Sequence, residues 1–420
     1  MEYEKTVLGN GLTLVSSNMP YSNSVSVAVF VSAGSRYEPK AINGASHFIE
    51  HMLFKGTEKR PTAKDVSEAI ESVGGVFNAE TGKEVTIYWT KVAKAHWELS
   101  ADVLADILLN SRFDPDEIEK ERKVIIEELN MLTDTPQDWV HVLFDDTIWG
   151  DQPIGRDVGG SRETVSALSR DAMLQYLRMR YTPTNVVVAV AGALTHAEVV
   201  ETIDSLLGGW KAEGTTTEGE PVTVADTPQV KLQPKKTEQA HLCLGYPGLS
   251  YLHPDRFTLD LLNVILGEGM SSRLFLEIRE KRGLAYDVHS YVNHYRDVGS
   301  TVVYAGVDPR RIDKAIQATL MEIEKLKAPI PPDEISKAKE FWKGRLLLRL
   351  EDTRAVASWL GGQQLLLGRI LTLDDVVRSI DEITDEDLVR VANELFVAHH
   401  VNLAVIGPFV KADRFVKLVR

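Results

Sequence analysis

The chain repeats one pattern of helix, strand and helix near the end of each of its halves. Ser169 is suited to begin a helix that leads into an apolar strand ending at Gly192, and Thr384 begins an equivalent helix before a strand ending at Gly407. In both copies the glycine lies 23 positions after the capping residue (192 − 169 and 407 − 384). The second copy is therefore displaced from the first by a constant 215 positions along the sequence. Such a recurrence indicates duplication, because both copies bury apolar faces in the same way. The sequence therefore predicts two homologous domains.

Each half mixes strands with helices. Residues 6–15 have strand character and contain an Asn-Gly turn, and helical character begins near residue 43. Residues 211–228 are polar, with Gly, Thr and Glu gathered at their start and no apolar period, which is typical of a linker. We predict an α+β fold of two homologous α/β-sandwich domains, residues 1–210 and 229–420, which arise from an internal duplication.

Composition narrows the class of protein further. The 420 residues carry a net charge of −14 without a basic block, which disfavours nucleic acid and anionic membranes as partners. The apolar stretch 186–194 is far shorter than the about 20 residues of a membrane-spanning helix. Residues 1–5 resemble neither a signal nor a transit peptide. Cys243, the single cysteine, is expected to be a buried apolar side chain. We predict a cytoplasmic protein.

The segment H-x-x-E-H is the most informative motif for chemistry. On a helix, His47, Glu50 and His51 share one arc of about 100°, while apolar residues surround them. Burying two imidazoles and a carboxylate is costly unless a metal compensates, and histidines at i and i+4 can hold zinc from one face. Glu50 would then serve as a general base. The alternative, a surface helix with polar residues at this spacing, is disfavoured by the apolar flanks.

A second helix supplies a candidate for the third zinc ligand. Residues 115–131 follow an Asp-Pro start, and Glu121 and Glu128 lie seven positions apart within an apolar stripe. We predict Glu128 as the ligand and Glu121 as a residue that orients a histidine or the base. An exposed Glu-rich helix is the alternative, and it does not explain carboxylates inside the stripe.

These motifs resemble those of the inverted-zincin peptidases of the pitrilysin/insulinase type, most closely the bacterial members that resemble the mitochondrial processing peptidase. The resemblance covers essentially the whole chain, and 69 and 76 residues separate His51 from Glu121 and Glu128, as the family spacing requires. It implies that His47, His51 and Glu128 bind one zinc ion per chain, that Glu50 is the base and that Glu121 supports the site.

The second half lacks the H-x-x-E-H motif but resembles the C-terminal domain of the same family. The resemblance implies that Arg279 and Tyr286 reach the substrate, where both could donate hydrogen bonds to a developing oxyanion. Without the family, Arg279 could equally form a salt bridge at a helix end. In relatives, the strand edge that corresponds to Asn78, Ala79 and Glu80 pairs with the substrate backbone, although an ordinary hairpin edge is the alternative.

The resemblance implies a zinc metalloendopeptidase or oligopeptidase that cleaves unfolded peptides or presequence-like segments inside a clamshell. Because one chain carries both sets of residues, we expect a homodimer, with a heterodimer of paralogous subunits as the other possibility. The alternative functions are a non-catalytic or partner-dependent structural subunit, which would be expected to lack the zinc motif, and a metal-dependent hydrolase of another substrate.

Overall fold

The computed structural model describes residues 2–212 and 219–419. They form two compact units, each assembled from three segments of the chain. The first unit contains Met1–Asn130, Asp157–Glu220 and Leu347–Asp374, and the second contains Met131–Arg156, Pro221–Leu346 and Asp375–Arg420. Among the described helices, none is both long and apolar enough to span a lipid bilayer.

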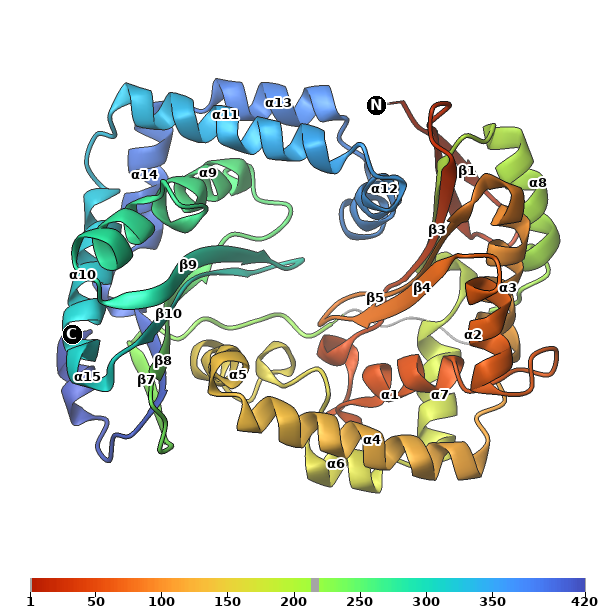
Figure 1. Cartoon of the computed structure of the whole chain (residues 1–420), viewed down its shortest axis with the longest axis horizontal. Coiled ribbons are helices and arrows are strands. Elements are labelled where there is room, and N and C mark those ends of the chain that lie inside the picture. The colour runs from red at the N-terminus through yellow and green to blue at the C-terminus, as the bar shows by residue number, and fades with distance from the viewer. Residues whose placement is uncertain (1, 213–218, 420) are drawn as a thin grey trace. The chain divides into compact units, whose positions relative to one another are not determined.

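The first unit is built on a six-stranded sheet in the order β1-β2-β6-β3-β5-β4. Figure 1 shows β5 and β4 of this sheet side by side. β2 and β6 are parallel and the other neighbouring pairs are antiparallel, with β4 at one edge. The predicted Asn-Gly turn joins β1 to β2, and Gly11 adopts a φ of 91° there, which glycine tolerates best. The strands are β1 (Glu4–Val7), β2 (Thr13–Asn18), β3 (Ser24–Val31), β4 (Val76–Thr81), β5 (Thr86–Ala93) and β6 (Val186–Gly192).

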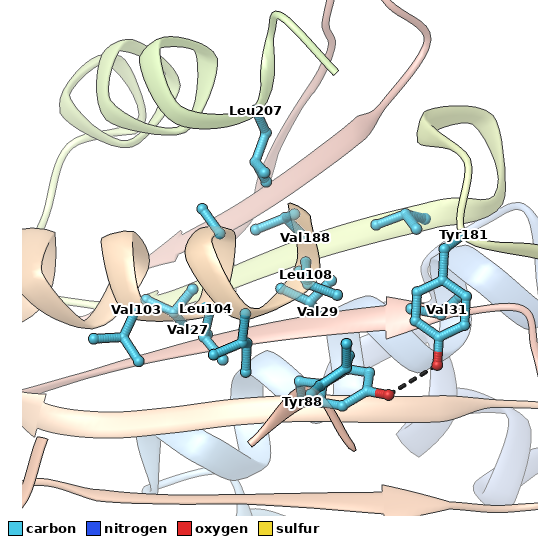
Figure 2. Packing of buried hydrophobic residues seen from close by; sticks show 14 of the residues in the cluster. Val27, Val29, Val31, Tyr88, Val103, Leu104, Leu108, Tyr181, Val188 and Leu207 are labelled. Carbon is cyan, nitrogen blue, oxygen red and sulfur yellow. Dashed lines mark hydrogen bonds between the residues drawn. The ribbon is translucent and has the colours of Figure 1, made fainter. Parts of the chain in front are cut away.

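Helices cover both faces of this sheet. On one face α3 packs against β3 and β5, and α8 packs against β2, while on the other face α12 packs against β2, β3 and β6. Figure 2 shows the first of these cores, in which the buried hydroxyls of Tyr88 and Tyr181 form a hydrogen bond of 2.8 Å. The helices of this unit are α1 (Ala45–Leu53), α2 (Ala63–Glu71), α3 (Trp97–Asn110), α4 (Pro115–Asp134), α6 (Arg162–Ala167), α7 (Arg170–Arg180), α8 (His196–Leu207) and α12 (Thr353–Leu367).

The second unit has a five-stranded sheet in the order β7-β11-β8-β10-β9, in which only β7 and β11 pair in parallel. α9, α14 and α15 pack on one face, and α5 packs against β7, β8 and β11 on the other. Cys243 lies on the α5 face and is buried, as predicted. The elements are α5 (Pro136–Trp149), β7 (Gln229–Pro234), β8 (Ala240–Gly248), α9 (Arg256–Gly267), β9 (Ala285–His294), β10 (Gly299–Val307), α10 (Ile312–Lys325), α11 (Pro332–Arg349), α13 (Leu373–Glu382), α14 (Asp385–Leu395), β11 (Asn402–Gly407) and α15 (Asp413–Leu418).

The two sheets share one topology. The order β2-β6-β3-β5-β4 in the first unit corresponds to β7-β11-β8-β10-β9 in the second, and in each the first pair is the parallel one. Ser169 caps α7 before β6, and Thr384 caps α14 before β11, as the repeated pattern predicts. The α+β class and the two-sheet architecture are therefore confirmed.

The compact units differ from the predicted domains 1–210 and 229–420 in two segments. Residues 131–156, which include α5, belong to the unit of the second sheet, and residues 347–374, which include α12, belong to the unit of the first. Each sheet thus packs against one helix from the other half of the chain. Residues 213–218 of the predicted linker 211–228 lie outside the described residues, and the part 219–228 contains neither helix nor strand.

Candidate metal site

Helix α1 begins at a buried carboxylate that the sequence analysis did not identify. One oxygen of Glu38 accepts a hydrogen bond of 2.7 Å from the backbone N–H of Gly44, and the other accepts one of 2.6 Å from that of Ser46. Burial raises the pKa of Glu38, and these hydrogen bonds oppose the rise. Gly44 has a φ of 98°, and a Cβ there would lie 2.7 Å from the carbonyl oxygen of Gly159, so glycine is required. The start of α1 is therefore fixed.

The apolar residues of α1 anchor it in the core of the first unit. Phe48, Ile49, Met52 and Leu53 are fully buried. The partly buried face of the helix carries His47, Glu50 and His51, as the periodicity predicts. The motif therefore lies on a helix that is anchored in the core and leaves its three polar side chains only partly buried.

Helix α4 packs beside α1 and presents the two glutamates. The guanidinium of Arg122 lies 5.4 Å from the ring centroid of Phe48 and donates to the carbonyl oxygen of Val165, which holds α4 against its neighbours. Glu121 is buried, whereas the side chain of Glu128 is 46% exposed.

The prediction that both glutamates lie inside one apolar stripe was therefore only half right. Ile118 and Ile125 are buried with Glu121, but Val124 and Met131 are exposed like Glu128. The stripe turns away from the core along the helix, because α1 and its neighbours cover only one side of α4.

Three predicted ligands converge. The Nε2 atoms of His47 and His51 lie 3.8 Å and 3.5 Å from one Oε2 of Glu128, and the two imidazole rings are 4.7 Å apart. All three donor atoms lie within 4.8 Å of one another. Two imidazoles and one carboxylate are a donor set that zinc takes in catalytic sites, with one position left open. Burial and the proximity of His51 lower the pKa of His47 to about 4, so this imidazole is neutral and able to bind a cation at pH 7.

A hydrogen-bonded chain orients one ligand. The Nδ1 of His51 is 2.9 Å from Oε2 of Glu121, and the ammonium of Lys55 is 2.6 Å from the other oxygen. Burial alone would raise the pKa of Glu121, but hydrogen bonds with His51 and Lys55 outweigh it and lower that pKa. The sequence analysis did not identify Lys55, which lies in the loop after α1, two residues beyond its end at Leu53.

Glu50 lies between the metal ligands and an edge strand. Thr81, the last residue of β4, donates a hydrogen bond to its Oε2. Burial raises the pKa of Glu50, and the charges of Glu128 and Glu80 add to this, while Thr81 and His51 oppose it. A raised pKa makes the carboxylate a stronger base.

The predicted substrate strand is the edge strand β4. Asn78 and Glu80 are exposed and Ala79 is half-buried, and the side chain of Asn78 accepts a hydrogen bond of 2.9 Å from the backbone N–H of Ala79. Sequence alone could not link Thr81 to Glu50, because the packing of α1 against β4 brings them together across 31 positions.

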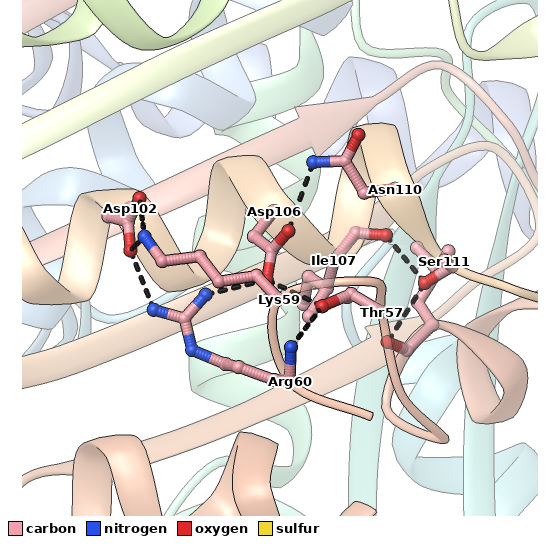
Figure 3. A network of polar contacts seen from close by, with 9 residues as sticks. Thr57, Lys59, Arg60, Asp102, Asp106, Ile107, Asn110 and Ser111 are labelled. Atoms are coloured by element: carbon pink, nitrogen blue, oxygen red, sulfur yellow. Dashed lines mark hydrogen bonds and ion pairs between the residues drawn. The ribbon is translucent and has the colours of Figure 1, made fainter. Parts of the chain in front are cut away.

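A buried polar network fixes the loop that follows α1 (Figure 3). Asp106 on α3 accepts hydrogen bonds from Thr57 at 2.7 Å and from Arg60 at 2.6 Å. Arg60 also pairs with Asp102, and Ser111 donates to the carbonyl oxygen of Leu53 at the end of α1. Because each buried charge is paired, the network holds the C-terminal end of α1 and the loop that follows it in place.

Arg279 and Tyr286 lie in the second unit and contact each other. Arg279 is on η6 (Phe275–Lys281), a π-helix, and its guanidinium lies 4.5 Å from the ring centroid of Tyr286 and 4.8 Å from that of Phe275. π-Helical turns are rare and frequently occur at functional sites. Tyr286 is 75% exposed.

Comparison with known proteins places the chain in a family. Residues 13–162 match the family described as Insulinase (Peptidase family M16), and residues 167–341 match the one described as Peptidase M16 inactive domain. An uncharacterized zinc protease of Streptomyces coelicolor is 39% identical over 411 residues, which cover 96% of this chain and 89% of that protein. The chain belongs to the insulinase family, peptidase family M16.

Two further known proteins are similar to this chain over almost its full length. The uncharacterized zinc protease YmxG of Bacillus subtilis is 38% identical over 406 residues, which cover 95% of this chain and 97% of that protein. The crystal structure of a protease from Helicobacter pylori matches with a TM-score of 0.92 at 26% identity and covers 97% of this chain and 99% of that one. The predicted family is thus confirmed, whereas the branch that resembles the mitochondrial processing peptidase stays a prediction.

Proposed function

We propose that the protein is a zinc-dependent endopeptidase or oligopeptidase in which His47, His51 and Glu128 hold one zinc ion. The observation that carries this proposal is the convergence of the three donor atoms within 4.8 Å on two packed helices. The names of the relatives, which are zinc proteases, support the choice of metal and reaction.

Zinc, when bound, would polarise the scissile carbonyl and lower the pKa of a water molecule. Glu50 would accept the proton of the attacking water and deliver it to the leaving amine. Its burial and raised pKa suit this role, since a base with a pKa nearer to neutrality can both take and return a proton. Glu121 would keep the ring of His51 in one orientation and one tautomer.

The substrates that we propose are unfolded peptides or presequence-like segments, cleaved within an enclosed cavity. Among the described residues β4 is the last strand of its sheet, and an extended chain could add to its edge at Asn78, Ala79 and Glu80. Such a chain would be bound through its backbone and so be accepted with little regard to sequence. Arg279 and Tyr286 are proposed to stabilise the tetrahedral intermediate by donating hydrogen bonds. We further propose a cytoplasmic homodimer, with a paralogous partner subunit as the alternative.

The decisive variant is Glu50→Gln. It removes the proton acceptor but preserves the volume and the three ligands, so we expect the same zinc content as in the native protein and a fall in kcat of about 10²–10⁴-fold. Zinc would be measured by metal analysis of the purified protein, and cleavage by mass spectrometry of an unstructured peptide library.

Glu127→Gln is the matched control, because Glu127 is an exposed neighbour of the ligand Glu128 on the same helix. We expect normal cleavage and normal zinc content in this variant. Loss of zinc from Glu50→Gln would make Glu50 structural, and a zinc-loaded native protein that cleaves no peptide would favour the non-catalytic subunit instead.

A further inference from the structure

The second unit contains another group of side chains able to bind a metal, formed by Asp226, His399 and His400. The Nε2 atoms of His399 and His400 lie 3.7 Å and 3.5 Å from the same Oδ1 of Asp226. The two rings are 4.3 Å apart in an edge-on arrangement. Both imidazoles thus direct the same ring nitrogen toward a single carboxylate oxygen.

The register of the sheet explains why these residues meet. β7 and β11 are parallel neighbours, and Gln229 pairs with Asn402 at the start of both strands. Asp226 lies three residues before Gln229, and His399 lies three residues before Asn402. Because neighbouring parallel strands start at the same end of a sheet, the segments that precede β7 and β11 lie side by side.

Local hydrogen bonds hold each segment in place. The side chain of Gln229 donates to the carbonyl oxygen of Thr227 at 3.0 Å, which closes the turn after Asp226. The histidines lie on the short helix η8 (Ala398–His400), where the buried side chain of Asn402 donates to the carbonyl oxygen of His400 at 2.9 Å. The three ligands therefore start from two restrained backbones, which lowers the entropy lost when a cation binds.

The group has the same chemistry as the candidate metal site of the first unit. Both consist of two imidazole Nε2 atoms and one carboxylate oxygen, with distances of 3.7 Å and 3.5 Å here against 3.8 Å and 3.5 Å there. They differ in exposure, since the side chain of Asp226 is 90% exposed and that of Glu128 is 46% exposed. Water competes more effectively at an exposed site, so its affinity for metal is expected to be the weaker of the two.

We propose that Asp226, His399 and His400 form a second metal site, which binds a divalent transition-metal ion such as Zn²⁺. Imidazole suits Zn²⁺, Cu²⁺ and Ni²⁺, whereas Mg²⁺ and Ca²⁺ prefer oxygen ligands. The ion would connect the segment that leads into β7 to the turn that leads into β11. This site shares no residue with the peptidase site proposed above, whose zinc ligands and general base belong to the first unit.

The test is the zinc stoichiometry of the full chain, stripped with chelator and titrated with ZnCl₂ in a calorimeter. We expect a tight event and a weaker one in the native protein. His399→Ala and Asp226→Asn should each weaken the second event by at least about 100-fold and leave the first intact, since loss of a ligand costs more than loss of a residue that merely orients one. His51→Ala should remove the tight event and spare the weaker one.

His253→Ala is the matched control. His253 is also partly exposed and lies 3.9 Å from the carboxylate of Asp255, but this pair is not part of a three-ligand group in the part of the chain that the structure describes. Both binding events should persist in this variant. A single event in the native protein, or a weaker event that survives both His399→Ala and Asp226→Asn, would overturn the proposal.

Discussion

The hydrogen-bonded chain of His51, Glu121 and Lys55 shows how single residues set the properties of the metal site. Glu121 is buried and accepts hydrogen bonds from His51 on one oxygen and from Lys55 on the other. An unpaired carboxylate would be costly there, so Lys55 keeps Glu121 ionised and able to orient the ring of His51. Lys55 is therefore expected to influence metal binding without touching the metal.

Lys55→Met should weaken zinc binding by about 10–100-fold, because Glu121 then loses the partner that stabilises its charge. Competition with a chromogenic chelator measures this affinity. Lys59→Met is the control, since Lys59 lies four residues further along and pairs with Asp102 instead. Equal zinc affinity in the two variants would show that Lys55 contributes only surface charge.

Thr81 adjusts the pKa of Glu50, the proposed general base. Burial raises the pKa of Glu50, and the hydrogen bond from Thr81 lowers it. A general base works only when it is unprotonated, so activity falls as the pH drops through its pKa. Thr81→Val removes the opposing contribution, and the acidic limb of the profile of kcat/KM against pH should move to higher pH. Thr81→Ser keeps the hydroxyl and should leave the limb in place; a limb that moves to lower pH in Thr81→Val would contradict the assignment.

At the scale of elements, local patterns were predictable and long-range contacts were not. His47, Glu50 and His51 lie at positions i, i+3 and i+4 of one helix and therefore share a face. Their spacing in the sequence is enough to predict this. Glu38 and Thr81 reach the same helix from other elements, and nothing in the periodicity of their own segments indicates it. The exposure of Glu128 depends on which neighbours cover α4, which the apolar stripe could not show.

The π-helix η6 is an element whose geometry the sequence did not predict. Its wider turn places Phe275 and Arg279 so that the guanidinium lies over the phenyl ring, with Tyr286 as its second aromatic neighbour. If Arg279 acts on the substrate as proposed, Phe275 is a positioning residue. Its ring packs against the guanidinium of a long and flexible side chain and so favours one position of that group.

Phe275→Leu should therefore lower kcat more than it raises KM. Loss of one cation–π contact worth about 1 kcal/mol corresponds to roughly a fivefold fall in kcat. Zinc content should not change, because Phe275 belongs to neither of the two groups of candidate metal ligands. Phe275→Tyr retains the aromatic face and should restore kcat, whereas a purely structural role would leave kcat of the folded Leu variant unchanged. Steady-state kinetics of both variants on one peptide distinguish the positioning role of Phe275 from a purely structural one.

At the scale of the whole molecule, the duplication was predictable but the composition of the units was not. The offset between the two copies follows from residues such as Gly192 and Gly407, which end equivalent strands. The assignment of α5 and α12 depends on which sheet each helix covers, and either sheet offers an apolar face of similar composition. A boundary drawn in the linker therefore separates each sheet from a helix that it needs.

Gly361 on α12 tests whether a helix from the second half of the sequence packs on the sheet of the first unit. A Cβ at this position would lie 2.1 Å from the ring of Phe30 on β3. Gly361→Ala must displace α12 or the buried ring, so we expect the free energy of unfolding to fall by about 1–3 kcal/mol. Denaturant titration followed by circular dichroism measures this change.

Gly362→Ala is the matched control on the same helix, where an added Cβ would meet nothing within 4 Å. Alanine favours a helix over glycine, so this variant should gain stability, by up to about 1 kcal/mol. Opposite effects at adjacent positions separate packing from helix propensity. If Gly361→Ala were as stable as Gly362→Ala, α12 would not pack against β3 in solution. The sheet of the first unit would then need no helix from the second half of the chain.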